Sequence, residues 1–250
     1  MTISYYGHAA NPADSATVKF ANPDAPLPIT PPSGMATGDL VFVIVALRDL
    51  SGLSVSNAGG QTWTSESNIQ FGSVTHRRFW CTFNGTWSAN PTFTAAYLGT
   101  YAKMSAVMLV FRPSGSPTWA VDVAQTDDKL ALSSPWDVTA TGQTSVDAST
   151  VSIATWVTTN ASPPVAALQT GGWTNPDSQT QWRNTNGTST DLLISAAYKI
   201  QTSAGATGNV VNRLTGVATT VYWTMQTLKD QSAGPAFYQY DWPHPLHARR

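Results

Sequence analysis

One apolar run, Asp39–Leu47, stands out from the alternation of apolar and polar residues along the chain. Turn-forming segments bound it on both sides, with Pro31–Gly34 before it and Asp49–Gly52 after it. The run is too short to cross a membrane, and its β-branched residues favour a strand buried on both faces over a helix. A weaker run of the same kind, Thr150–Val157, lies in the second half of the chain. These two runs predict the central strands of the fold.

The other apolar segments are short and separated by turn residues, as is typical of an all-β sandwich. No helical apolar period persists anywhere, so we expect little helix. A short alternating segment between two Asn-Pro pairs, Ala16–Phe20, predicts an edge strand. The further predicted strands are His76–Phe83, Pro91–Ala95, Met104–Phe111, Leu192–Tyr198, Asn209–Val211 and Thr219–Met225.

The second half repeats the first in the order of its segments, and each half carries a glycine-tryptophan turn. These turns are Gly59–Trp63 and Gly171–Thr174. The join between the halves carries apolar residues at Trp119–Val123 and Leu130–Leu132, so it is no flexible linker. We therefore predict one antiparallel sandwich, of the jelly-roll or immunoglobulin-like kind, built from two pseudo-repeated halves. Its predicted parts are an N-terminal edge strand and extended arm (1–30), the sandwich (31–231, with halves 31–115 and 143–231) and a C-terminal arm (232–250).

The composition argues against some classes of binding partner. Only 11% of the 250 residues are charged and the net charge is -1, so the chain lacks the basic surplus that holds nucleic acid. The single cysteine, Cys81, excludes an intrachain disulfide and a cysteine-rich zinc site, and its strand context predicts a buried residue. The N-terminus lacks the pattern of a signal peptide and no segment is apolar for long enough to span a membrane. We expect a protein that is made and kept in a cytoplasm, or that leaves it by a route without a cleaved signal, and that has no membrane partner.

The polar residues form no recognisable catalytic or metal-binding motif. Glu66 is the one glutamate among fourteen acidic residues, and most aspartates lie in turn contexts. Asp122, Asp127 and Asp128 lack the spacing of a calcium loop, and the histidines have no zinc spacing. Nucleophile elbows, phosphate loops and dinucleotide fingerprints are absent from the sequence. We expect no catalytic residue, no cofactor and no metal.

The ten tryptophans divide by context. Trp63 and Trp173 follow the glycine turns, where an indole can close each end of a core. Trp80, Trp156 and Trp223 fall inside predicted strands and are expected in the core. Four others stand in polar surroundings and are the candidates for a ligand-binding or protein-binding face: Trp87, Trp119, Trp136 and Trp182.

The C-terminal arm is rich in aromatic residues and proline, with Phe237, Tyr238, Tyr240 and Trp242 followed by Pro243 and Pro245. Left in solvent, these residues would promote aggregation. Either the arm folds back on its own sandwich or it docks on a neighbouring subunit. The gain from burying the aromatics and the entropy cost of ordering the arm are of similar size, so one arm alone is near break-even.

Several of these segments resemble a family. Pro31–Val43 is similar to the opening of a two-half β-sandwich family of tailed bacteriophages and prophages, in which two glycines precede Asp-Leu and an apolar strand. Gly171–Thr174 resembles its glycine-tryptophan-threonine turn, and Ala196–Gly208 with the strand to Leu228 resembles its last hairpin. The resemblance covers roughly residues 30–230, while Gly59–Trp63 departs from it by lacking a proline and carrying inserted residues before the tryptophan. The resemblance implies a component of the virion surface and supplies no catalytic residues.

We therefore expect a non-enzymatic structural component of a tailed-phage virion, assembled in the host cytoplasm. Head decoration on the outer capsid surface, as a cement protein, is the first expectation, and a tail or neck accessory protein is the second. The expected partners are the major capsid protein or tail and neck proteins, together with further copies of this chain. The alternative of another class is a carbohydrate-binding adhesin or receptor-binding module that contacts a host-surface glycan, and a hydrolase ranks third.

Overall fold

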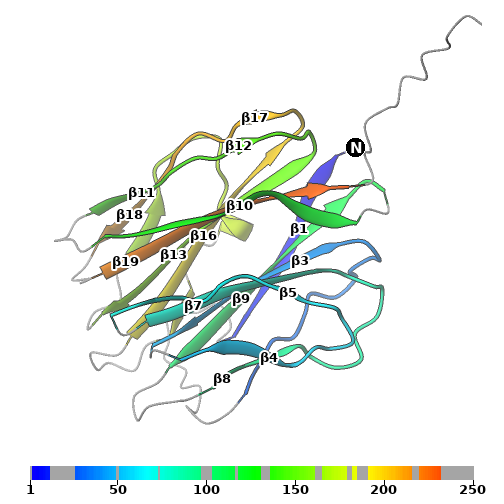
Figure 1. Ribbon diagram of the computed structural model, residues 1–250, viewed down its shortest axis with the longest axis horizontal. Coiled ribbons are helices and arrows are strands. Elements are labelled where there is room, and N and C mark those ends of the chain that lie inside the picture. Colours follow the sequence, from blue (N-terminus) through cyan, green and yellow to red (C-terminus); the bar gives the residue numbers. More distant parts are fainter. Residues whose placement is uncertain are drawn as a thin grey trace, which may run out of the picture.

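The computed structural model describes residues 2–11, 26–48, 51–72, 74–96, 103–115, 118–130, 136–160, 165–178, 182–184, 191–215 and 220–231. Within these residues the protein is all-β, with antiparallel pairing throughout and a single turn of 3-10 helix, η1 (Pro176–Ser178) (Figure 1). The described part of the chain therefore contains no helix of the length and hydropathy that a membrane crossing requires.

The strands are numbered in chain order. Their bounds are β1 (Ile3–Asn11), β2 (Leu27–Pro28), β3 (Leu40–Leu47), β4 (Leu53–Asn57), β5 (Thr64–Ser65), β6 (Ile69–Phe71), β7 (Val74–Thr82), β8 (Thr92–Ala95), β9 (Met104–Pro113), β10 (Trp119–Leu130), β11 (Trp136–Ala140), β12 (Thr144–Ser145), β13 (Thr150–Asn160), β14 (Val165–Leu168), β15 (Trp182–Asn184), β16 (Asp191–Gln201), β17 (Gly205–Ala206), β18 (Val210–Thr215) and β19 (Thr220–Asp230).

Two large sheets carry the two predicted central strands. The first large sheet has the order β1-β9-β3-β7-β5, with β6 also paired to β7. The second large sheet has the order β10-β19-β13-β16-β15. All eight residues of β3 are buried, which confirms the prediction of a strand covered on both faces.

Two three-stranded sheets cover the outer faces of the large ones. The first small sheet has the order β2-β8-β4 and the second small sheet has the order β11-β18-β14, while β12 and β17 pair as a separate ribbon. In Figure 1 the first small sheet lies at the bottom, and the second lies at the upper left beyond the large sheets.

Three apolar clusters separate these layers. Successive residues of β3, such as Phe42 and Val43, point to opposite faces and belong to different clusters. The first cluster lies between the two large sheets and joins Phe42 and Ile44 of β3 to residues such as Ile153 of β13. The second fills the space between the first large and small sheets, and the third fills the space between the second pair. The body is therefore a stack of four layers, with both large sheets inside.

The sequence located most of these strands. The predicted segments 76–83, 91–95, 104–111, 192–198 and 219–225 each overlap a strand, and the join between the halves contains β10. β1 is an edge strand within the N-terminal segment, whereas the predicted edge strand Ala16–Phe20 lies outside the described residues. Trp80, Trp156 and Trp223 are 8%, 0% and 5% exposed, so their prediction as core residues is confirmed.

Candidate functional site: the loop before the central strand

The loop that leads into β3 depends on two glycines. Gly34 and Gly38 have φ angles of 76° and 95°, a region that residues with a side chain rarely adopt. A Cβ atom at Gly34 would also lie 2.6 Å from Tyr6 Oη. The spacing of these glycines before Asp39 is therefore set by the path of the backbone.

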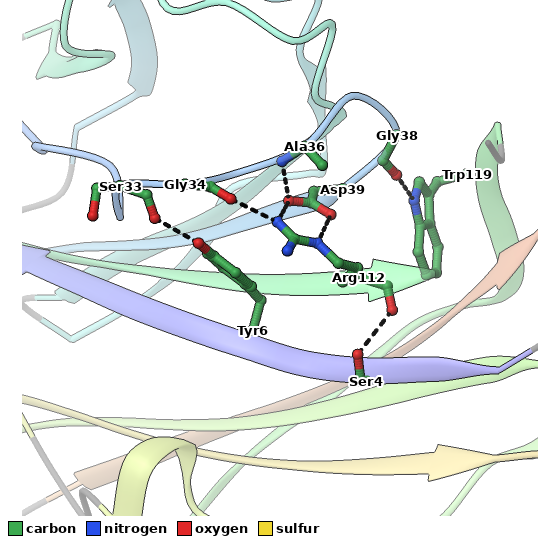
Figure 2. A network of polar contacts seen from close by, with 9 residues as sticks. All are labelled: Ser4, Tyr6, Ser33, Gly34, Ala36, Gly38, Asp39, Arg112 and Trp119. Carbon is green, nitrogen blue, oxygen red and sulfur yellow. Dashed lines mark hydrogen bonds and ion pairs between the residues drawn. The ribbon is translucent and has the colours of Figure 1, made fainter. Parts of the chain in front are cut away.

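The carboxylate of Asp39 is buried, with 1% of the side chain exposed, and it accepts three hydrogen bonds. Ala36 N donates to Oδ2 at 2.8 Å, closing the loop on itself. Arg112, near the end of β9, donates from Nε to Oδ1 at 2.9 Å and from Nη2 to Oδ2 at 2.8 Å (Figure 2). The hydrogen bonds with Asp39 raise the pKa of Arg112, so this guanidinium stays charged.

The guanidinium of Arg112 reaches beyond Asp39. It donates to the carbonyl oxygen of Gly34 at 3.0 Å and lies 3.9 Å from the centre of the Tyr6 ring in a cation-π contact. The Tyr6 hydroxyl donates to the carbonyl oxygen of Ser33 at 2.5 Å (Figure 2). β1, the loop and β9 thus meet at one arginine.

The same loop is also tied to the second large sheet. Trp119, the first residue of β10, donates from Nε1 to the carbonyl oxygen of Gly38 at 2.9 Å, and its side chain is 3% exposed. We call Tyr6, Gly34, Asp39, Arg112 and Trp119 the arginine clamp. It holds one loop against strands from both large sheets.

The chemistry available to the clamp is structural. The carboxylate of Asp39 is buried and hydrogen-bonded to a fixed cation, so it is neither an accessible base nor a nucleophile. Sequence reasoning found the loop but missed Tyr6 and Arg112. The signal that could have found Arg112 is its place as a single cation between the apolar run of β9 and the turn that starts at Pro113.

A second polar junction joins β1 to η1. Asp177 Oδ2 accepts a hydrogen bond from the Tyr5 hydroxyl at 2.9 Å and lies 2.5 Å from His8 Nδ1. The Tyr5 ring stacks on Tyr198 of β16 at 4.9 Å between centroids, and the His8 ring lies edge-on to Trp182 at 5.5 Å. β1 is a strand of the first large sheet, and these side-chain contacts connect it to the second.

A third polar group is buried between the two large sheets. Arg78 and His76 of β7 are each 3% exposed, and Gln226 of β19 donates to Glu66 Oε1 at 2.6 Å. Burial lowers the pKa of Arg78 to about 9, against the attraction of Glu66 and Asp127. Burial, and then repulsion by Arg78, lowers the pKa of His76 to about 3, so this imidazole is neutral at physiological pH. Both Nη atoms of Arg78 and Nε2 of His76 have no hydrogen-bond partner among the described residues, which makes this polar group costly to keep buried.

Most of the four tryptophans that are candidates for a ligand-binding or protein-binding face lie inside the body. Trp119, Trp136 and Trp182 are 3%, 4% and 1% exposed, so these three indoles are packed inside the body. Trp87 is half-buried and stacks on Phe83 at 5.1 Å. The four indoles therefore do not form one exposed platform.

The remaining candidates fall into structural places or outside the described residues. Cys81 is buried at 1% exposed, and burial raises the pKa of its thiol. Among the described ranges, no three His, Cys, Asp or Glu side chains come together in a way that could hold a metal ion. The arm residues Phe237, Tyr238, Tyr240, Trp242, Pro243 and Pro245 all lie outside the described residues.

Comparisons of the chain with protein-family models, with curated proteins and with solved structures found no match.

Proposed function

We propose that this chain is a non-enzymatic structural component of a tailed-phage virion. Head decoration on the outer capsid surface is the role that we favour, and a tail or neck accessory role is the alternative. The observation that carries the proposal is the use made of Pro31–Val43, the segment on which the family resemblance rests. Its glycines and Asp39 hold strands together in the arginine clamp, which is an architectural use and not a catalytic one.

We also propose that the body consists of two pseudo-repeated halves, each a large sheet with its small sheet. The strand orders support this: β1-β9-β3-β7 has its counterpart in β10-β19-β13-β16, and β2-β8-β4 in β11-β18-β14. The pairing register also shifts at the same place in both halves. The shift lies between Tyr5 and Gly7 in β1, which pairs with β9, and between Val121 and Val123 in β10, which pairs with β19.

When the two halves are matched strand by strand, the arginine clamp has a counterpart in the second half. Leu40 of β3 pairs with Phe111 of β9, and Val151 of β13 pairs with Leu228 of β19 in the same way. The residue after Phe111, Arg112, therefore corresponds to the residue after Leu228, Lys229. Lys229 Nζ lies 2.5 Å from Asp147 Oδ2, in the loop before β13. A cation at the end of the last strand thus binds an acidic residue in the loop before the central strand in both halves.

The C-terminal residues 232–250 are proposed as the docking arm, with the aromatic residues and prolines named above as its contacts. In the four-layer body both large sheets are covered on each face, so their apolar faces are already occupied. Attachment of this chain to a virion partner would then use strand edges, loops and arms. Because one arm is near break-even energetically, the proposal requires a preformed groove on the partner or several copies acting together.

The test is a comparison of particles that carry the full chain with particles that carry a chain lacking 235–250. The truncated protein is expected to keep its denaturation midpoint, because the proposed contacts of the arm are with a partner, but to be lost from purified particles. A shorter deletion of 246–250, which leaves the aromatic residues in place, is the matched control and should still join particles.

Two outcomes would count against the proposal in different ways. Incorporation of the 235–250 deletion at normal copy number would refute the arm assignment. Absence of the full chain from intact particles, examined by cryo-electron microscopy and mass spectrometry, would refute the virion role itself.

A further inference from the structure

A hollow of about 450 Å³ opens beside the glycine-tryptophan turn that follows β14. Its volume falls within the roughly 300–1,000 Å³ that is typical of small-molecule sites. Gln169, Thr170, Gly171, Trp173, Asn175 and Ser178 are among the residues that line it. None of the four tryptophans singled out from the sequence belongs to it.

The polar groups around the hollow are neutral. Asn175 Nδ2 donates to the carbonyl oxygen of Ala196 at 2.9 Å, and Gln169 Nε2 donates to that of Ala167 at 2.9 Å. Each amide therefore uses a donor within the protein and keeps its side-chain oxygen as an acceptor for a ligand. The Thr170 hydroxyl accepts a hydrogen bond from Val211 N at 2.7 Å and can still donate, and the Ser178 hydroxyl can donate or accept.

The indole of Trp173 supplies a second and independent observation. Its side chain is 6% exposed and lines the hollow, yet its Nε1 has no hydrogen-bond partner among the described residues. A buried donor without a partner costs about 1–3 kcal/mol. Because Nε1 itself is covered, a ligand in the hollow could pair with it only after the indole turns toward the hollow.

The backbone on one side of the hollow is strained. Asp177 and Ser178 have φ angles of 48° and 61°, which costs a residue with a side chain about 1–3 kcal/mol. Tyr5 and His8 hold Asp177 in this conformation through its carboxylate. Such strain is found at binding sites, where it fixes a recognition loop before the ligand arrives.

Charge decides the class of ligand. The described residues that line the hollow include no cation that could hold a phosphate or a carboxylate, and the nearby Asp177 side chain, which is 49% exposed, repels anions. Neutral amide and hydroxyl groups around an indole fit a neutral ligand rich in hydroxyl groups. We propose that this hollow binds one or two neutral sugar units of a glycan.

The test uses the purified full chain. An array of neutral and acidic oligosaccharides selects the best binder, and its dissociation constant is then measured by titration calorimetry. Gly171→Phe is the blocking variant: Gly171 lines the hollow, has no positive φ, and has nothing within 4 Å of an added Cβ. Gln169→Ala removes one acceptor, and Trp87→Phe is the control at an indole remote from the hollow.

The expected result is binding of a neutral oligosaccharide that weakens about tenfold or more in Gly171→Phe and several-fold in Gln169→Ala, with Trp87→Phe unchanged. Unchanged denaturation midpoints show that the variants are folded. Absence of binding to every neutral oligosaccharide, binding to acidic ones alone, or unaltered affinity in Gly171→Phe would overturn the proposal. Because the assay uses isolated protein, its failure leaves the particle-incorporation test of the virion role untouched.

Discussion

Replacing Arg112 by methionine tests whether the arginine clamp stabilises the body. Methionine keeps much of the length of the side chain and can still pack on the Tyr6 ring, but it removes both hydrogen bonds to Asp39. The carboxylate of Asp39, 1% exposed, would then keep only the hydrogen bond from Ala36 N.

The size of the effect follows from this stranded charge. Removing one partner of a buried ion pair costs about 3–5 kcal/mol. Because the Arg112 side chain is itself 33% exposed, water can replace part of its contribution, and we expect a loss of about 3 kcal/mol in the free energy of unfolding. For a chain of this length such a loss lowers the thermal midpoint by roughly 6–12 °C.

The assay is thermal and urea denaturation of the full chain, with Arg213→Met as the matched control. Arg213 makes the same bidentate pair with Asp137, at 2.7 Å for both bonds, but the two side chains are 48% and 47% exposed. An exposed pair of this kind adds little to stability, so this control is expected to unfold at the wild-type midpoint.

A double variant separates the stranded charge from lost packing. Adding Asp39→Asn to Arg112→Met removes the buried charge, so it should recover part of the lost stability. If Arg112→Met unfolds together with Arg213→Met, or if the added Asp39→Asn lowers stability further, the reasoning about the clamp is wrong.

Three further predictions concern single residues. Gly34→Ala should lose about 1–3 kcal/mol from its positive φ and more from the approach to Tyr6 Oη, whereas Gly172→Ala, with φ 80° and open space, should show the backbone cost alone in urea denaturation. His76 takes up a proton in the unfolded chain below pH 6.5 but in the folded chain only near pH 3. Stability should therefore decrease as the pH is lowered from 6.5 toward 3, with the unfolding constant rising about tenfold per pH unit. His76→Phe should flatten the measured slope, and an unchanged slope would contradict the assignment. The buried thiol of Cys81 should resist a thiol reagent in the native protein and react only on unfolding, so rapid native labelling would be inconsistent with its burial.

The sequence predicted the strands well because the local pattern determines them. β3 could be recognised from its run of β-branched residues, and β13 from a weaker run of the same kind. The join between the halves could be excluded as a flexible linker because Trp119–Val123 needed burial, and it forms β10.

The polar contacts could not be predicted, because their partners are far apart in the chain. Arg112 and Asp39 are 73 residues apart, and Tyr5 and Asp177 are 172 apart. The burial of the tryptophans was hidden for a related reason: Trp136 and Trp182 stand among polar residues in the sequence, yet both indoles are buried. Only the packing of sheets decides which face of a strand is covered.

The apolar cluster between the two large sheets has a consequence for how this body can be assembled. Phe42 and Ile44 on one side and Ile153 and Ile194 on the other are each fully shielded only by the opposite sheet. A fragment cut at the β9–β10 connection would carry one such face into water, where the hydrophobic effect drives it onto a second copy of itself or onto the missing fragment. Co-expressed halves would therefore be expected to find each other without a covalent link, whereas either half produced alone would associate or precipitate.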